Sequence, residues 1–496
     1  MSLKSLTVLA GILSVSAGSF LQSDEYQVPL VSGSSRRPNI VFILTDDQDL
    51  HMNSLDYVPF IKKHLIDQGT LYKRHFCGYP KFVAEGHNEN YLPKLLQDVG
   101  YDTYYTGKLF NAHTVDNYHS PHAAGWTGSD FLLDPFTYSY LNATFQRNQD
   151  PPVSHEGEYS TDVLAGKALD FLDDAVAASK PFFLGIAPVA PHSNVQSNVI
   201  SNGSVHDPHG IVATPPIPAE RHAHLFPDAI VPRTDNFNPE KVSGANWVRQ
   251  QPRQSAENIA FNDHFYRNRL RALQAVDELV DSVVSRLEEY GILEETYIFY
   301  TTDNGYHIGH HRLQPGKECG YEEDINIPLI IRGPQVPEGK VAEIVTTHQD
   351  LVPTIMSLAQ APLRADFDGL AIPLTEEDFG DAAKTRHEHV TVEYWGFAAS
   401  EGPWGYFGRN ESFVFNNTYK ALRVVSKEYN LYYSAWCNNE HELYDLNVPF
   451  AHILGAHCIR KAMWTLCATH FHRDSTVSIS NNKFESNTRV ARWVIL

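Results

Sequence analysis

Apolar and polar positions along this chain fall into blocks that predict strands and helices in turn. Residues 39–45 and 297–302 are nearly continuous apolar runs, rich in β-branched and aromatic side chains, and each ends abruptly in acidic residues. Such runs are typical of strands covered on both faces of a sheet. Helical spacing occurs at residues 57–69, 91–100, 161–177, 267–290 and 350–359, and further strand-like runs occur at 101–106, 181–187 and 327–332. The alternation predicts an α/β fold with a large, mainly parallel sheet flanked by helices.

The pattern changes twice along the chain. Residues 192–262 are rich in Pro, Asn, His and Ser and predict long loops above the sheet. From about residue 386 short strands, at 411–415, 420–425 and 442–446, predict a smaller C-terminal antiparallel subdomain. We therefore expect an α/β domain over residues 36–375, a small subdomain over 386–447 and a divergent tail over 448–496 without clear periodicity.

The N-terminus has the layout of a secretory signal peptide. Lys4 precedes an apolar stretch at residues 6–18, and small residues follow before Gln22, so we assign residues 1–22 to this leader. No later stretch is long and apolar enough for a membrane span. Asn-x-Ser/Thr acceptors for N-glycans occur at Asn142, Asn202, Asn410 and Asn416. We expect a protein that is secreted or resides in another compartment of the secretory pathway.

Composition narrows the functional classes. The chain has 496 residues, 42% of them hydrophobic, which allows a sizeable core. Its 39 basic and 59 acidic residues give a net charge of −20, which argues against a broad nucleic-acid-binding surface. An anionic substrate would need basic residues gathered locally. The 5 cysteines are too few for a disulfide scaffold, and an odd number cannot all pair within the chain.

The two acidic clusters are the first candidates for chemistry. Asp46 and Asp47 follow the strand at 39–45, and Asp303 and Asn304 follow the strand at 297–302. Ligands of parallel sheets bind at the carboxyl ends of the strands, so neighbouring strands would bring these side chains together. Four hard oxygen donors suit Ca²⁺, and less well Mg²⁺. Taken alone, an Asp pair after a strand also fits a helix cap or a solvated loop.

Basic residues occur at comparable positions. Lys108 and His192 each follow a predicted strand, and Lys317 lies beyond the second acidic cluster. Beside a divalent cation they would form a site for a tetrahedral oxyanion, which indicates phosphoryl or sulfuryl ester hydrolysis. His307 and His310, close after Asn304, could donate a proton to a leaving group. Taken alone, Lys108 fits a surface lysine better and His192 fits a loop or structural histidine better, whereas His307 and His310 could equally be solvated loop residues.

The ordered set of motifs resembles the sulfatase family, within the alkaline-phosphatase-like superfamily, and is most similar to secreted fungal-type arylsulfatases and glucosamine-6-sulfatases. The resemblance covers roughly residues 37–446 and rests on Asn39-Ile-Val-Phe-Ile-Leu-Thr-Asp-Asp-Gln48, Tyr104-Tyr-Thr-Gly-Lys-Leu-Phe-Asn111, Ala187-Pro-Val-Ala-Pro-His192, Thr301-Thr-Asp-Asn-Gly305 and Asp350-Leu-Val-Pro-Thr354. It implies that Asp46, Asp47, Asp303 and Asn304 bind Ca²⁺, and that Lys108, His192 and Lys317 hold a sulfate ester.

One family feature is missing. Sulfatases of this kind use a Cys-x-Pro-Ser-Arg signature, whose Cys is oxidised to formylglycine and supplies the nucleophile. The signature does not occur here; the nearest stretch, His75-Phe-Cys77-Gly-Tyr-Pro80-Lys81, has a different Cys-to-Pro spacing and no Arg. In similar sequences the two halves of that stretch flank the signature. We infer that Cys77 is an upstream, unmodified cysteine joined to Gly78 across a missing segment that would carry the nucleophile.

Three hypotheses follow. The first is a sulfuric ester hydrolase of which this sequence, as written, has little or no activity. Either an altered transcript or gene model omits the segment near Cys77 and adds the tail, or the protein has lost catalysis. The second is a noncatalytic secreted protein that retains the anion pocket. The third, least favoured, is a phosphatase or phosphodiesterase of the same superfamily, which would need further His and Asp ligands for two Zn²⁺ ions.

Overall fold

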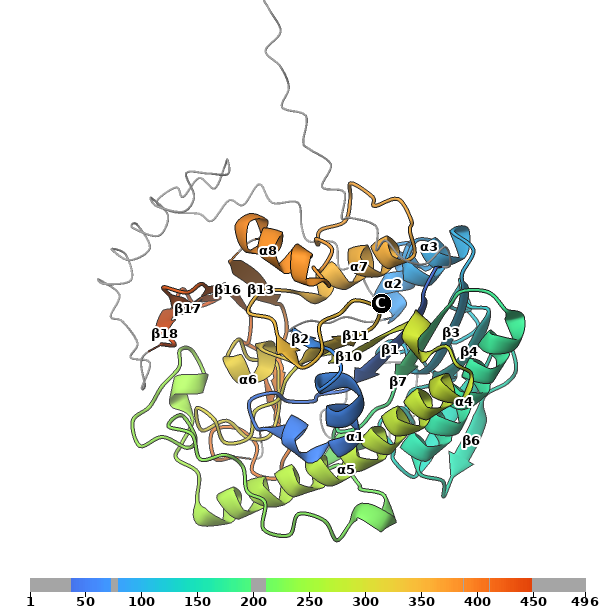
Figure 1. Ribbon diagram of the computed structural model, residues 1–496. Coiled ribbons are helices and arrows are strands. Elements are labelled where there is room, and N and C mark those ends of the chain that lie inside the picture. The colour runs from blue at the N-terminus through green and yellow to red at the C-terminus, as the bar shows by residue number, and fades with distance from the viewer. Residues whose placement is uncertain (1–36, 73–78, 198–210, 387, 410, 448–496) are drawn as a thin grey trace, which may run out of the picture.

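The computed structural model describes residues 37–72, 79–197, 211–386, 388–409 and 411–447 (Figure 1). Several predicted features lie outside these residues: the leader, the Cys77–Gly78 junction, the acceptors Asn202 and Asn410, and the tail after residue 447.

A ten-stranded sheet forms the centre of the protein (Figure 1). In spatial order its strands are β12 (Lys340–Val341), β2 (Thr70–Tyr72), β11 (Leu329–Arg332), β10 (Thr296–Thr302), β1 (Asn39–Thr45), β7 (Phe182–Ala187), β3 (Asp102–Lys108), β4 (Gly128–Leu132), β5 (Asn142–Arg147) and β6 (Val153–Glu156). The run from β10 to β4 is parallel throughout, and antiparallel pairs flank it on both sides. The predicted large, mainly parallel sheet is confirmed.

Helices cover both faces of this sheet, as Figure 1 shows. They are α1 (Pro59–Ile61), α2 (Tyr79–Ala84), α3 (Leu92–Asp98), α4 (Ser160–Ala178), α5 (Ala256–Glu289), α6 (Glu322–Ile325), α7 (Leu351–Leu358) and α8 (Glu376–Thr385). Side chains alternate along a strand, so β1 contributes to both layers. Val41 and Ile43 pack with α4 and α5, whereas Ile40 and Phe42 pack with α3 and α7. This two-sided burial explains the nearly continuous apolar sequence of β1.

Helix α5 begins earlier than its apolar spacing predicts, at Ala256 rather than at residue 267. The Ser255 side chain caps the helix by accepting a hydrogen bond from the backbone N–H of Asn258. Asn258 and Asn262 then occupy buried positions, where the Asn258 side chain bonds Gln314 and the Asn262 side chain bonds Gln254. Because polar residues fill the buried face of these first turns, the apolar periodicity begins only later.

The helix predicted at residues 57–69 is wrong as a single element. The chain instead forms a 3₁₀ turn (Ser54–Tyr57), the short α1, a π turn (Lys62–Ile66) and then β2. Asp277 of α5 accepts hydrogen bonds from the backbone N–H groups of Phe60 and Ile61, at 2.9 and 2.6 Å. A carboxylate from another helix therefore sets where α1 begins, and local spacing cannot reveal that contact.

The predicted loops at residues 192–262 hold two short paired strands, β8 (Asn194–Ser197) and β9 (Ile211–Thr214), and end at α5. The C-terminal part forms the predicted antiparallel sheet, in the order β13 (His389–Tyr394), β16 (Tyr419–Val425), β17 (Asn430–Trp436) and β18 (His441–Asp445). A separate two-stranded pair, β14 (Ala398–Ala399) and β15 (Phe413–Val414), lies in the segment that joins β13 to β16. The predicted domain boundaries stay predictions. In the part of the chain that the structure describes, no helix combines the length and hydropathy of a membrane span.

Candidate functional site

The two acidic clusters lie side by side. Strands β1 and β10 pair in parallel with Thr45 opposite Thr302, so Asp46, Asp47, Asp303 and Asn304 leave the sheet at the same edge. The backbone N–H of Asp47 donates to Oδ1 of Asp303 at 3.0 Å, and Nδ2 of Asn304 donates to Oδ1 of Asp47 at 2.7 Å. Asp47 has a φ of 70°, a conformation that costs energy for a residue other than glycine and often marks a functional site.

Two largely buried lysines form ion pairs with this cluster. Lys108 ends β3 and places Nζ 2.6 Å from Oδ2 of Asp46 and 3.7 Å from Oδ2 of Asp303. Lys317, on the loop between β10 and α6, places Nζ 2.6 and 2.8 Å from the two carboxylate oxygens of Asp47. The structure thus brings together basic residues from two distant segments and carboxylates from two others.

The pKa values reflect both burial and these ion pairs. Burial alone would raise the pKa of Asp47, but the adjacent Lys317 ammonium lowers it below its usual range. Burial, and next the charge of Asp46, raises the pKa of Asp303 to about 7. Burial opposes the charge of Lys108, yet Asp46 holds the pKa of that lysine well above its usual range. Both lysines are therefore protonated at neutral pH.

His192 completes the group after β7. Its Nε2 lies 3.7 Å from Oδ2 of Asp47, and its Nδ1 donates to the carbonyl oxygen of Ser193 at 2.8 Å. Its ring stacks on Tyr138, with centroids 4.2 Å apart. Burial, and next the Lys317 charge, lowers the pKa of His192, so its imidazole is neutral and Nε2 is free to accept a proton or bind a metal ion.

The oxygen donors fit a hard divalent cation. Oδ1 of Asp46 is buried and has no hydrogen-bond partner among the described residues, an unsatisfied state that a cation would relieve. With all three carboxylates ionised, Asp46, Asp47 and Asp303 with Lys108 and Lys317 leave one net negative charge. A divalent cation would turn this into one net positive charge, which suits an anionic ester.

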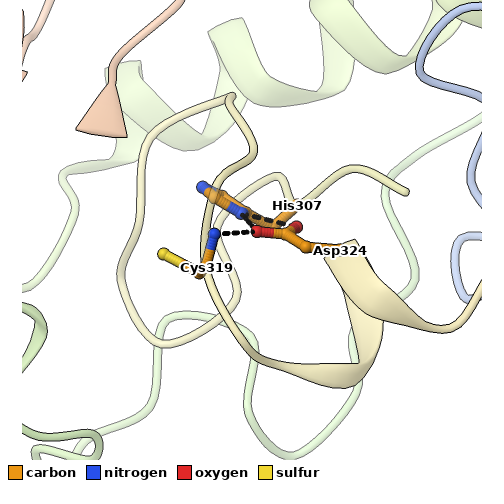
Figure 2. Close-up of side chains that lie close together, drawn as sticks. All are labelled: His307, Cys319 and Asp324. Atoms are coloured by element: carbon orange, nitrogen blue, oxygen red, sulfur yellow. Dashed lines mark hydrogen bonds and ion pairs between the residues drawn. The ribbon is translucent and has the colours of Figure 1, made fainter. Parts of the chain in front are cut away.

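His307 lies in a neighbouring cluster, which Figure 2 shows. Its Nδ1 lies 2.8 and 2.9 Å from the carboxylate oxygens of Asp324, and Oδ2 of Asp324 also accepts from the backbone N–H of Cys319 at 2.8 Å. Ligand atoms of these three residues lie within 4.8 Å of one another. Burial raises the pKa of the Cys319 thiol well above its usual range, so the thiol is a poor ligand.

The cluster in Figure 2 instead braces the loop that carries Lys317. His307 exchanges backbone hydrogen bonds with Gly316, of 2.9 and 3.2 Å, while Asp324 holds Cys319 on the other side of the lysine. His310 is buried against Phe237, and burial lowers its pKa to about 4. The geometry associates His307 with the positioning of Lys317, and the predicted catalytic roles of His307 and His310 stay predictions.

Two functional neighbours were missed from the sequence. Arg269 of α5 is fully buried and donates through its guanidinium to the carbonyl oxygen of Asp47 and, at 3.3 Å, to Asp49. Glu401 is buried and accepts from Ser193 and, at 2.6 Å, from the Tyr306 hydroxyl. A charged residue beside the apolar face of a long helix was the available signal for Arg269. Glu401 follows β14, and no motif marks it.

Comparisons with known proteins identify the family. A sequence model described as Sulfatase matches residues 79–361. The arylsulfatase of Volvox carteri is 35% identical, with 84% of this chain and 71% of that protein covered. The N-acetylglucosamine-6-sulfatase of Capra hircus is 30% identical, with 83% of this chain and 78% of that protein covered. This chain belongs to the sulfatase family.

A solved structure shows the same fold. The complex of BT4656 with its substrate D-glucosamine-2-N,6-O-disulfate has a TM-score of 0.66 and 20% identity, and the match covers 87% of this chain and 96% of that one. The predicted family and fold class are therefore confirmed. Strand β1 and its two aspartates lie before the residues that the family model matches, so their place in the site rests on the geometry described above.

Proposed function

We propose that this chain descends from a sulfuric ester hydrolase of the arylsulfatase type and retains its site for Ca²⁺ and a sulfate ester. One observation carries the proposal: Lys108 and Lys317 each meet a strand-end carboxylate at 2.6 Å, around one buried cluster. Asp46, Asp47, Asp303 and Asn304 would hold the cation, which would supply charge that polarises a sulfate oxygen. The two lysines would hold further sulfate oxygens.

His192 is the best-placed proton carrier. Its Nδ1 donates to a backbone carbonyl, so Nε2 carries the lone pair and faces Asp47 across 3.7 Å. Once Nε2 has accepted a proton, the imidazolium can bind a sulfate oxygen and donate that proton to a leaving alcohol. Its stacking on Tyr138 keeps the ring in this orientation.

We further propose that the chain as written turns over little substrate. No Cys-x-Pro-Ser-Arg signature occurs anywhere in the sequence, so no cysteine of that motif can become formylglycine. Among the residues that the structure describes, those that contact the carboxylates are lysines, a histidine and an amide, and none is an activated hydroxyl or thiolate of the kind that covalent catalysis requires. The binding half of the site is thus present without its expected nucleophile.

The names of the relatives suggest the substrate class. An arylsulfatase and an N-acetylglucosamine-6-sulfatase both act on sulfate esters by name, so we propose an aryl or sugar sulfate as the ligand. A secreted location follows from the predicted leader. A phosphatase with two Zn²⁺ ions is less favoured. A second Zn²⁺ would need the neighbouring cluster of His307, Cys319 and Asp324, and His307 and Cys319 already form hydrogen bonds with Asp324.

The test separates binding from turnover. Calorimetry on chelator-treated protein should show one Ca²⁺ per chain, weaker Mg²⁺ binding, and loss of both in Asp303→Ala. Coexpression with a formylglycine-generating enzyme and assay of 4-nitrophenyl sulfate should give little hydrolysis. Robust turnover that Asp303→Ala abolishes would refute the inactive assignment, and two Zn²⁺ per chain would instead support the phosphatase. Two findings together would support the noncatalytic anion-binding protein. They are sulfate-ester binding without turnover by the protein, and a messenger RNA that lacks the missing segment.

A further inference from the structure

Three phenylalanine rings form an exposed cluster on the small β14–β15 sheet. The rings of Phe397, Phe413 and Phe415 lie 5.2, 6.1 and 6.4 Å apart between centroids. Phe415 is 74% exposed and Phe397 is 39% exposed. We name these three residues the aromatic platform. Gathered aromatic surface of this kind normally has a partner, because leaving it in water is unfavourable.

An acceptor for an N-glycan lies in the turn that follows β15 and contains Phe415. Asn416 follows Phe415 directly, and the sequence Asn416-Asn417-Thr418 satisfies the Asn-x-Ser/Thr rule. Phe413 lies three residues before the acceptor, in strand β15, which leads into the turn. The Asn416 side chain is exposed, as a glycan on the folded protein requires.

The turn is held rigidly on its inner side. Nδ2 of Asn246 donates to the carbonyl oxygen of Asn416 at 2.7 Å. The next residue, Asn417, is fully buried; its Oδ1 accepts from the Trp247 indole at 2.9 Å, and its Nδ2 donates to the carbonyl of Glu318 at 2.7 Å. These bonds hold the Asn417 side chain inward, whereas Asn416 is exposed and directly follows Phe415.

We propose that Asn416 is N-glycosylated and that the first N-acetylglucosamine of this glycan packs on the aromatic platform. In the secretory pathway Nδ2 of Asn416 would attack C1 of a lipid-diphosphate-linked oligosaccharide. The N–C bond forms, the C–O bond to the lipid diphosphate breaks, and the amide loses one proton to the transferase. The C–H face of the sugar then covers ring surface that is otherwise in water.

The other described acceptor provides a matched control. Asn142 is half-buried within strand β5, and its Oδ1 accepts from the Ser154 hydroxyl at 3.2 Å. It belongs to a paired strand rather than to a turn beside the platform. The variants Asn416→Gln and Asn142→Gln therefore remove one acceptor each in contrasting surroundings.

The experiment uses the full chain expressed in a eukaryotic secretory host, recovered from the medium or from the membrane fraction. Mass spectrometry of glycopeptides should show Asn416 occupied, and Asn416→Gln should remove that glycan while Asn142→Gln leaves it in place. Trimming the folded protein to a single N-acetylglucosamine should leave the unfolding midpoint unchanged. Complete removal by peptide N-glycosidase should lower the midpoint by about 2 °C.

The variant Phe415→Ser isolates the stacking contact, because Phe415 is the most exposed ring of the platform. In this variant trimmed and fully deglycosylated protein should melt at nearly the same temperature. A bare Asn416 in protein that carries glycans at another acceptor would overturn the proposal. An equal loss of midpoint in Phe415→Ser and in the unaltered chain would also overturn it, as would binding of free sugar by a platform whose Asn416 is unmodified.

Discussion

Replacing Lys317 by methionine tests whether the buried ion pairs belong to a cation site. Methionine keeps most of the apolar stem but removes the ammonium group that lies 2.6 and 2.8 Å from the oxygens of Asp47. The Asp47 carboxylate is fully buried, and among the described residues it keeps the Asn304 amide, at 2.7 Å, as the one remaining hydrogen-bond donor to its side chain. Breaking a buried pair in this way costs about 3–5 kcal/mol, so we expect that loss of unfolding free energy in chelator-treated protein.

Calcium should reverse much of this loss. Without Lys317 the cluster carries one more net negative charge, so a divalent cation should bind more tightly to the variant than to the unaltered chain. Binding at 100 times the dissociation constant stabilises by about 2.7 kcal/mol. Urea unfolding with chelator and with Ca²⁺ measures both effects. Lys62→Met, at an exposed pair with Asp67, should lose less than about 1 kcal/mol and gain nothing from Ca²⁺.

The result that refutes this reasoning is specific. If Ca²⁺ stabilises neither protein, the carboxylates serve only as ion-pair partners. If Ca²⁺ stabilises the unaltered chain and the Lys317→Met variant equally, the cation binds without coupling to Lys317, and the reasoning from the Asp47–Lys317 pair is refuted. The effect of high salt separates screening from site binding, because monovalent salt weakens exposed pairs and leaves a buried site largely unaffected.

Further predictions concern stability around the site. Arg269→Met should lose about 3–5 kcal/mol in urea unfolding, because it leaves Asp49 buried without its partner. Gly107→Ala should lose at least about 2 kcal/mol, because φ is +110° there and the new Cβ would lie 2.1 Å from the carbonyl oxygen of Ala187. Burial raises the pKa of Asp277 from 3.8 to about 6. Protonated Asp277 therefore contributes fully to folding stability below pH 3.8, and this contribution is lost as the pH rises through 6. Relative to this chain, Asp277→Asn should therefore gain about 2 kcal/mol in unfolding free energy between pH 4 and pH 7, and an unchanged difference would contradict the burial argument.

The strands were predictable because burial on both faces leaves a plain signal. The expected strand at residues 39–45 coincides with β1, and the expected strand at 297–302 differs from β10 only in its first residue. Helix starts were less predictable, because side chains distant in sequence determine them. Asn258 is a polar residue at a buried position in the first turn of α5, so the apolar spacing does not reveal where this helix begins. Asp277 determines where α1 begins. Both effects are tertiary contacts that override local propensity.

The site was partly predictable for a topological reason. Residues that follow parallel strands leave the sheet at one edge, which is why Asp46, Asp303 and Lys108 could be grouped from the sequence. Lys317 belongs to a loop, so only the structure shows how it reaches Asp47. Glu401 comes from the connection between β14 and β15 and reaches the site only in the folded chain. Strand-end chemistry is thus visible in a sequence, whereas loop-borne partners need the fold.

The position of the missing signature explains how a binding site could outlast catalysis. The described chain on either side of the Cys77–Gly78 junction is anchored independently: β2 pairs with β11 and β12, and in α2 the buried Phe82 packs on Phe110 with centroids 4.6 Å apart. The strands that lead to Asp46, Lys108 and Asp303 are held by pairing among β10, β1, β7 and β3. Under the proposed function, loss of a segment there would remove a nucleophile while the cation and anion ligands keep their places. We therefore expect calcium binding and ester turnover to be separable in this chain, so each property needs its own measurement.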